Sequence, residues 1–86
     1  MTITSNNPNT IEAGHRVREA FQRFKKESNM DDLRWYYYCK RYENGDISTI
    51  MKAISKKYGK LPRCAVTVIR KEISKEIAIY QMCNND

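Results

Sequence analysis

Residues 60–82 read KLPRCAVTVIRKEISKEIAIYQM, and the fold depends on whether this stretch forms a helix or two strands. Its apolar residues recur at spacings of three and four, as they do on one face of a helix. These residues are Val66, Ile69, Ile73, Ile77 and Tyr80. The spacing predicts a helix to about Met82. Pro62 fits its first turn, where the missing N–H of proline is no loss.

The run AVTVI within this stretch favours a different structure, because β-branched side chains suit a strand. A hairpin formed by residues 64–70 and 76–82 is therefore the alternative. It would make the fold α+β, with a C-terminal β-hairpin, in place of mainly α.

The segment before this stretch predicts a helix that starts at Asp46 or Ser48. Its apolar residues again follow the helical period. They are Ile47, Ile50, Met51, Ile54 and Tyr58. Gly59 is a natural end for this helix, because glycine adopts the left-handed conformation without a Cβ clash.

Further toward the N-terminus, residues 33–42 read LRWYYYCKRY. Asp31 or Asp32 can cap a helix here, and Asn44-Gly45 can end it. One face of that helix is apolar and aromatic, and we interpret it as core. It consists of Trp35, Tyr38, Cys39 and Tyr42.

A basic amphipathic helix precedes that segment. Asn9 is its expected N-cap, with Glu12 three residues on, and it ends near Ser28-Asn29. Its apolar positions are Ile11, Val17, Ala20, Phe21 and Phe24. We expect residues 1–8 to be a flexible tail and residues 9–86 to form a single helical domain. The predicted fold is mainly α, a compact four-helix domain with a helix-turn-helix-like unit.

Positive charge is concentrated in one part of the chain. The formal net charge is +6 and the pI about 9.4. From Met51 to Lys71 there are seven basic residues and no acidic one, so the rest of the chain has a net charge of −1. Such a cluster favours an acidic partner, of which nucleic acid is the commonest.

This basic segment also has the pattern of a helix-turn-helix. A lysine-rich helix ends at Gly59, Leu61 can fill the angle after the turn, and a second helix follows that can lie in the major groove of DNA. Arg63 could bond guanine, and Thr67 a base edge or a phosphate; Cys64 and Val68 would also face outward. The predicted nucleic-acid-binding residues are Lys52, Lys56, Lys57, Lys60, Arg63, Thr67, Arg70 and Lys71.

The segment YYYCKRYENGDISTIMKAISKKYG followed by VTVIRKEISKEI resembles the sigma-factor region-4-like domains found in small late-gene transcription regulators of bacteriophages. The resemblance covers roughly residues 33–76. It implies duplex DNA binding in transcriptional control. The chain departs from the family pattern after Gly59, where the connection is one residue longer, Lys60 replaces an apolar residue and Pro62 replaces the usual serine or threonine cap. Ser55 also stands where alanine is usual.

The aromatic segment supports two other functions. Tyr36, Tyr37 and Arg41 could form a protein-binding surface, as in a small inhibitor or adaptor that acts on a host enzyme with an acidic surface. Exposed rings could also stack on bases, which would favour single-stranded RNA over duplex.

Catalysis has little support in the sequence. The chain has one histidine, His15, no glycine-rich phosphate loop and no spacing typical of a nucleophile and its base, so we expect no enzymatic activity and no cofactor. Three widely spaced cysteines indicate reduced thiols, with no metal site. The absence of a signal peptide and of a long apolar run leads us to expect a cytoplasmic protein, either a monomer or a homodimer.

Overall fold

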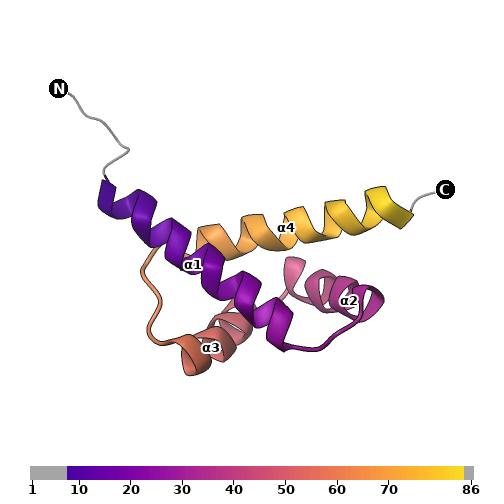
Figure 1. Ribbon diagram of the computed structural model, residues 1–86, viewed down its shortest axis with the longest axis horizontal. Coiled ribbons are helices and arrows are strands. Elements are labelled where there is room, and N and C mark those ends of the chain that lie inside the picture. Colours follow the sequence, from indigo (N-terminus) through magenta and orange to yellow (C-terminus); the bar gives the residue numbers. More distant parts are fainter. Residues whose placement is uncertain (1–7, 85–86) are drawn as a thin grey trace.

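Four α-helices form the fold, which a computed structural model describes for residues 8–84 (Figure 1). They are α1 (Pro8–Glu27), α2 (Asp32–Glu43), α3 (Ile47–Tyr58) and α4 (Ala65–Asn84). These residues contain no strand, so the mainly α prediction is confirmed. The alternative hairpin over 64–70 and 76–82 is wrong.

Helix α4 is the element around which the others are arranged. It packs most extensively against α2, then against α1, and also against α3. Figure 1 shows α1 crossing α4, with α2 and α3 on the same side of α4. Because α4 contacts three helices, its side chains are divided sharply between a buried face and an exposed one.

The core lies between the four helices and contains the apolar faces predicted for them. Each large side chain that is buried there stabilises the fold by about 1.5–3 kcal/mol. The buried apolar residues are Val17, Phe21, Trp35, Cys39, Tyr42, Ile47, Ile50, Ile54, Ala65, Ile69, Ile73 and Ile77. The Trp35 ring packs 5.6 Å from Phe21 and stacks on Tyr38 at 5.5 Å. The interpretation of the aromatic segment as core is thus confirmed for Trp35 and Tyr42.

Local caps set the boundaries of α2 and α3, as predicted. The Asp31 side chain accepts a hydrogen bond from the Arg34 N–H at 2.8 Å, and Asp46 accepts one from the Ser48 N–H at 3.1 Å. Gly59 ends α3 with φ of 94°, a conformation that favours glycine.

The start of α4 differs from the prediction by three residues. The Pro62 carbonyl accepts a hydrogen bond from the Ala65 N–H at 3.0 Å, so Pro62 opens a turn instead of the helix. The residue before a proline is also biased toward extended backbone. The connection from Gly59 to Cys64 is therefore six residues long, longer than in a compact helix-turn-helix.

Three smaller predictions at the helix ends are also wrong. Helix α1 begins at Pro8, so Asn9 lies in its first turn and not at the N-cap; the rest of the predicted tail is outside the described residues. Ile11 is exposed instead of buried. On α4, Val66 is exposed, and Ala65 instead occupies the buried position one turn before Ile69.

Candidate nucleic-acid interface

The buried face of α4 includes two carboxylates. Glu72 is 4% exposed and Glu76 is 7% exposed, although both are charged residues in a chain of only 86. They are four positions apart, which places them one above the other on the same side of the helix. Buried charges require partners, and here α1 and α2 provide them.

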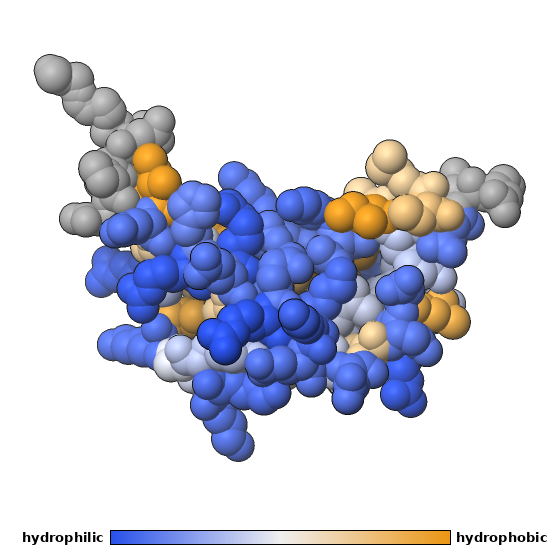
Figure 2. Space-filling model, viewed as in Figure 1, coloured by the Kyte–Doolittle hydropathy of each residue, from blue (hydrophilic) through white to orange (hydrophobic). Residues whose placement is uncertain are grey.

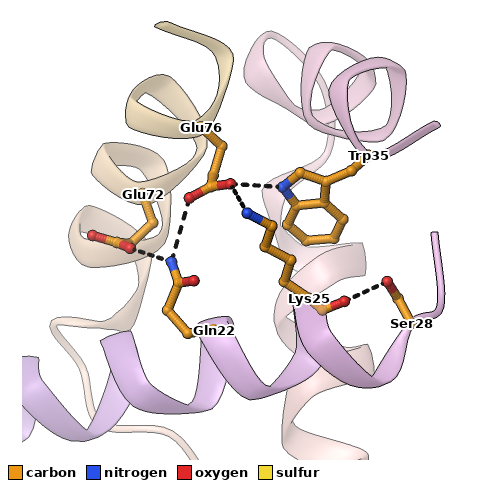
Figure 3. Close-up of polar contacts among 6 residues, drawn as sticks. All are labelled: Gln22, Lys25, Ser28, Trp35, Glu72 and Glu76. Atoms are coloured by element: carbon orange, nitrogen blue, oxygen red, sulfur yellow. Dashed lines mark hydrogen bonds and ion pairs between the residues drawn. The ribbon is translucent and has the colours of Figure 1, made fainter. Parts of the chain in front are cut away.

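The partners of these carboxylates form one connected cluster (Figure 3). Lys25 Nζ lies 2.6 Å from Glu76 Oε1, and the indole Nε1 of Trp35 donates to the same oxygen at 3.0 Å. Gln22 Nε2 donates to Glu72 at 2.9 Å and to Glu76 at 3.4 Å. Arg18 Nε completes the cluster, 3.4 Å from Glu72 Oε2. We call these residues the buried carboxylate cluster.

This cluster joins α4 to α1 and α2 through buried charge and hydrogen bonds. Every carboxylate oxygen of Glu72 and Glu76 lies within 3.4 Å of at least one donor from α1 or α2. Burial alone would raise the pKa of Glu76, but the hydrogen bond and the charge of Lys25, with the hydrogen bonds from Gln22 and Trp35, lower that pKa below its ordinary value. Glu76 is therefore a stable anion.

The exposed face of α4 has the opposite character. Arg70, Lys71 and Lys75 are exposed there, and Thr67 and Ser74 lie among them as small polar residues. Because Glu72 and Glu76 are the only acidic residues of this helix and both are buried, no carboxylate of α4 lies on its exposed side. We call Thr67, Arg70, Lys71, Ser74 and Lys75 the outer α4 face.

The predicted cations of α3 fall into two groups. Lys52 and Lys56 are exposed on the side opposite the buried stripe of Ile50 and Ile54. Lys57 instead lies 3.8 Å from Glu27 of α1, so part of its charge is neutralised within the chain. Lys52 and Lys56 thus remain available to a ligand, and Lys57 is a weaker candidate.

Two more of the predicted nucleic-acid-binding residues lie in the connection before α4. Lys60 and Arg63 are both exposed in it. Arg63 lies in the turn ahead of α4 and not in its first helical turn. The predicted contact of Arg63 with a guanine base assumed that Arg63 was part of the helix, and that assumption is wrong. Cys64 and Val68, which were expected to face outward, are half-buried and pack against the core.

Among the cations of the outer α4 face, Arg70 is the one that lines a pocket beside α3. This pocket lies where α4 meets the end of α2 and the start of α3, and its other lining residues are Tyr42, Glu43, Ile47, Ile73 and Ser74. On the other side of α4, the Val68 side chain lies next to Gly14 of α1. Arg70 is therefore on the α3 side of the outer α4 face.

One exposed cation was missed by the sequence analysis. Lys75 follows Lys71 by one helical turn, but the predicted basic segment ended at Lys71 because Glu72 comes next in the sequence. Only the burial of Glu72 and Glu76 reveals that the basic surface continues to Lys75. The buried positions were detectable in principle, since Ile69, Glu72, Ile73 and Glu76 follow the helical period.

The residues proposed for protein binding are also divided by the structure. Tyr36 is half-buried, with its ring stacked on Tyr80 at 4.5 Å, whereas Tyr37 is 63% exposed. The Arg41 guanidinium lies 5.6 Å from the Tyr42 ring. Of the predicted pair of rings, only Tyr37 is fully available to a partner.

Apolar exposure is concentrated elsewhere, at the end of α4. Figure 2 shows hydrophilic side chains over most of the face that α1 occupies, and hydrophobic ones over the C-terminal part of α4. Ile79 and Met82 are exposed there. This apolar end and the outer α4 face are two distinct parts of one helix.

Comparison with protein-family models, with curated proteins and with solved structures finds no match to this chain. The resemblance to sigma-factor region-4-like domains therefore stays a prediction. Among the described residues, no three side chains of the types that hold metals are grouped as a site. None of the described helices combines the length and apolar character needed to cross a bilayer.

Proposed function

We propose that this protein binds nucleic acid, and specifically duplex DNA, through the outer α4 face together with the exposed cations of α3 and the connection. One observation supports this most: folding buries both acidic residues of α4 and leaves its cations exposed. A ligand with regularly spaced negative charges would meet Arg70, Lys71 and Lys75 without an opposing carboxylate on that helix.

The shape of α4 favours a duplex. A helix of 20 residues is about 30 Å long, and the major groove of B-DNA admits an α-helix. Thr67 and Ser74 are short enough to let the helix axis approach the base edges. The longer Lys71 and Lys75 side chains can reach phosphates on either side.

The other exposed cations would extend the contact to the DNA backbone. We assign phosphate contacts to Lys52, Lys56, Lys60 and Arg63, and a smaller contribution to Lys57. A role in transcriptional control, such as that of a phage-type regulator, follows from the family resemblance alone and is part of the same proposal.

A matched pair of charge-reversal variants tests this proposal. Lys71→Glu with Lys75→Glu changes the outer α4 face, and Arg16→Glu with Lys26→Glu makes the same change on exposed positions of α1. Each double replacement removes four charge units, so +6 becomes +2 in both. Fluorescence anisotropy with a labelled 20-base-pair duplex at low salt measures the affinity of each variant.

We expect the α4 double variant to lose at least about tenfold in duplex affinity, and its log–log salt slope to become shallower by about 2. The α1 double variant should lose much less. Equal losses in the two variants would mean that only net charge matters, and no binding by the wild type at low salt would contradict the proposal outright.

A further inference from the structure

A second surface, on α2, combines an exposed ring with cations. Tyr37 lies between Arg34, three residues earlier, and Arg41, four residues later, and all three are exposed. Residues at these spacings are neighbours on one side of a helix. The two arginine positions therefore lie before and after Tyr37 along this side of α2, and the Arg41 guanidinium lies 5.6 Å from the Tyr42 ring.

The Tyr37 ring is held in place by other aromatic side chains. Its edge packs on Tyr36, with ring centroids 5.4 Å apart and an interplanar angle of 61°. Tyr36 in turn stacks on Tyr80 of α4 at 4.5 Å, and its hydroxyl accepts a hydrogen bond from Gln81 Nε2 at 3.4 Å. A ring supported in this way loses little conformational freedom when a ligand stacks on it.

Two carboxylates near this surface, Asp31 and Glu43, are engaged elsewhere. Asp31 caps α2 by accepting from the Arg34 backbone N–H, and Glu43 pairs with Lys40 at 3.4 Å. Within the part of the chain that the structure describes, neither Arg34 nor Arg41 forms an ion pair with a side chain. Both guanidinium groups can therefore bind an external anion.

We propose that the Arg34–Tyr37–Arg41 surface binds single-stranded nucleic acid, with a base stacked on the Tyr37 ring and backbone phosphates bound by the two arginines. Seven residues of helix span about 10 Å, which suits phosphates on either side of a stacked nucleotide. An apolar protein partner fits less well, because it would strip water from Arg34, Lys40 and Arg41.

This inference rests on the proposed function for the class of ligand, but it concerns different residues. The outer α4 face would bind the duplex, and the α2 surface would bind an unpaired segment. A nucleic acid that has both forms, such as a duplex with a single-stranded extension, would be the preferred ligand if one molecule can reach both surfaces.

The test compares two replacements of one residue. Tyr37→Phe keeps the ring, and Tyr37→Leu removes it at a position where little is buried. Labelled oligothymidine, titrated at low salt and followed by anisotropy, gives the single-strand affinity. We expect Tyr37→Leu to bind about tenfold more weakly than the wild type, and Tyr37→Phe to bind nearly as well, because stacking on an aromatic ring contributes ~1–3 kcal/mol per base.

The two proposals can fail separately in this experiment. Tyr37→Leu should leave the affinity for the blunt duplex unchanged, whereas Lys71→Glu with Lys75→Glu should lower it. Oligothymidine affinities that are the same for Tyr37→Leu and Tyr37→Phe would overturn the inference on α2 without affecting the proposal on α4. If Tyr37→Leu lost oligothymidine binding and no variant bound the duplex, the proposal on α4 would be overturned and the inference on α2 would be supported.

Sedimentation equilibrium of the same variants excludes a competing explanation. If the wild type self-associates and Tyr37→Leu does not, the Tyr37 surface joins two copies of the chain, and the single-strand assignment is wrong. We expect all three proteins to have the same molar mass in this measurement.

Discussion

The inner and outer faces of α4 contain charged residues of opposite sign, only a few positions apart in the sequence. Glu72 and Glu76 point into the bundle, where they meet Arg18, Lys25 and uncharged donors. Lys71 and Lys75 immediately precede them and point into solvent. On the inner face charge joins helices, and on the outer face it is exposed to solvent.

This difference shows why a charge count along the sequence underestimates the positive charge of an exposed helix face. From Arg70 to Glu76 the formal charges are three positive and two negative, so the segment looks nearly neutral. Folding removes the two negative charges from the exposed side. The electrostatic potential that a ligand meets depends on which face each charge occupies.

The largest expected effect comes from the inner face. Glu76→Ala would leave Lys25 and the buried Trp35 N–H without their acceptor, so we expect the free energy of unfolding to fall by about 2–4 kcal/mol. Urea denaturation measures this change. The matched control is Lys75→Ala, an exposed neighbour, which should change stability by no more than ~0.5 kcal/mol. Similar losses of unfolding free energy in Glu76→Ala and Lys75→Ala would contradict the claim that only the inner face of α4 stabilises the fold.

A smaller effect is expected from the cation that neutralises Glu76. Lys25→Met keeps the aliphatic stem but removes the charge, and should lower stability by about 1 kcal/mol, because Lys25 is partly exposed and screened by water. Lys26→Met is the control, since Lys26 is fully on the surface. Thermal unfolding of both variants should show a lower midpoint for Lys25→Met alone.

The pH dependence of stability follows from the lowered pKa of Glu76. A carboxylate whose pKa is lower in the folded state contributes stability above its unfolded value, about 4.5, and loses it as the pH falls through the folded pKa. We therefore expect the free energy of unfolding to decrease from pH 5 toward pH 3. Glu76→Gln should make that decrease shallower, and an unchanged pH profile would show that Glu76 is not engaged as described.

The smallest effects distinguish individual cations of the basic surface. Lys75→Ala should lower duplex affinity a few-fold and reduce the log–log salt slope by about 1, as expected for one lost phosphate contact. Lys57→Ala should have less effect, because Lys57 is already near Glu27. If Lys57→Ala weakened duplex binding more than Lys75→Ala, Lys57 would belong to the DNA-binding surface and Lys75 would not.

The parts of the fold that sequence reasoning predicted well depend on local chemistry. Asp31, Asp46 and Gly59 mark helix ends through hydrogen bonds and backbone conformations that involve only nearby residues. The start of α4 was misplaced because Pro62 suits both the first turn of a helix and the turn that precedes one. The long apolar period from Ile69 to Ile77 still identified a helix despite the β-branched run.

The parts that were missed depend on residues far apart in the chain. Lys25 and Trp35 reach Glu76 across 51 and 41 positions, so their effect on the buried face of α4 has no local signal. The pairing of Lys57 with Glu27 is likewise a tertiary contact. The helical period alone was enough to predict that Lys52, Lys56, Arg70 and Lys71 are exposed. That they bind DNA stays a prediction.

A titration of isotopically labelled protein with a short blunt duplex, followed through backbone amide chemical shifts, tests the central claim most directly. We expect the largest shifts on the outer α4 face and on the connection before it, with little change at Tyr37. Shifts confined to α2, or no shifts at low salt, would contradict it.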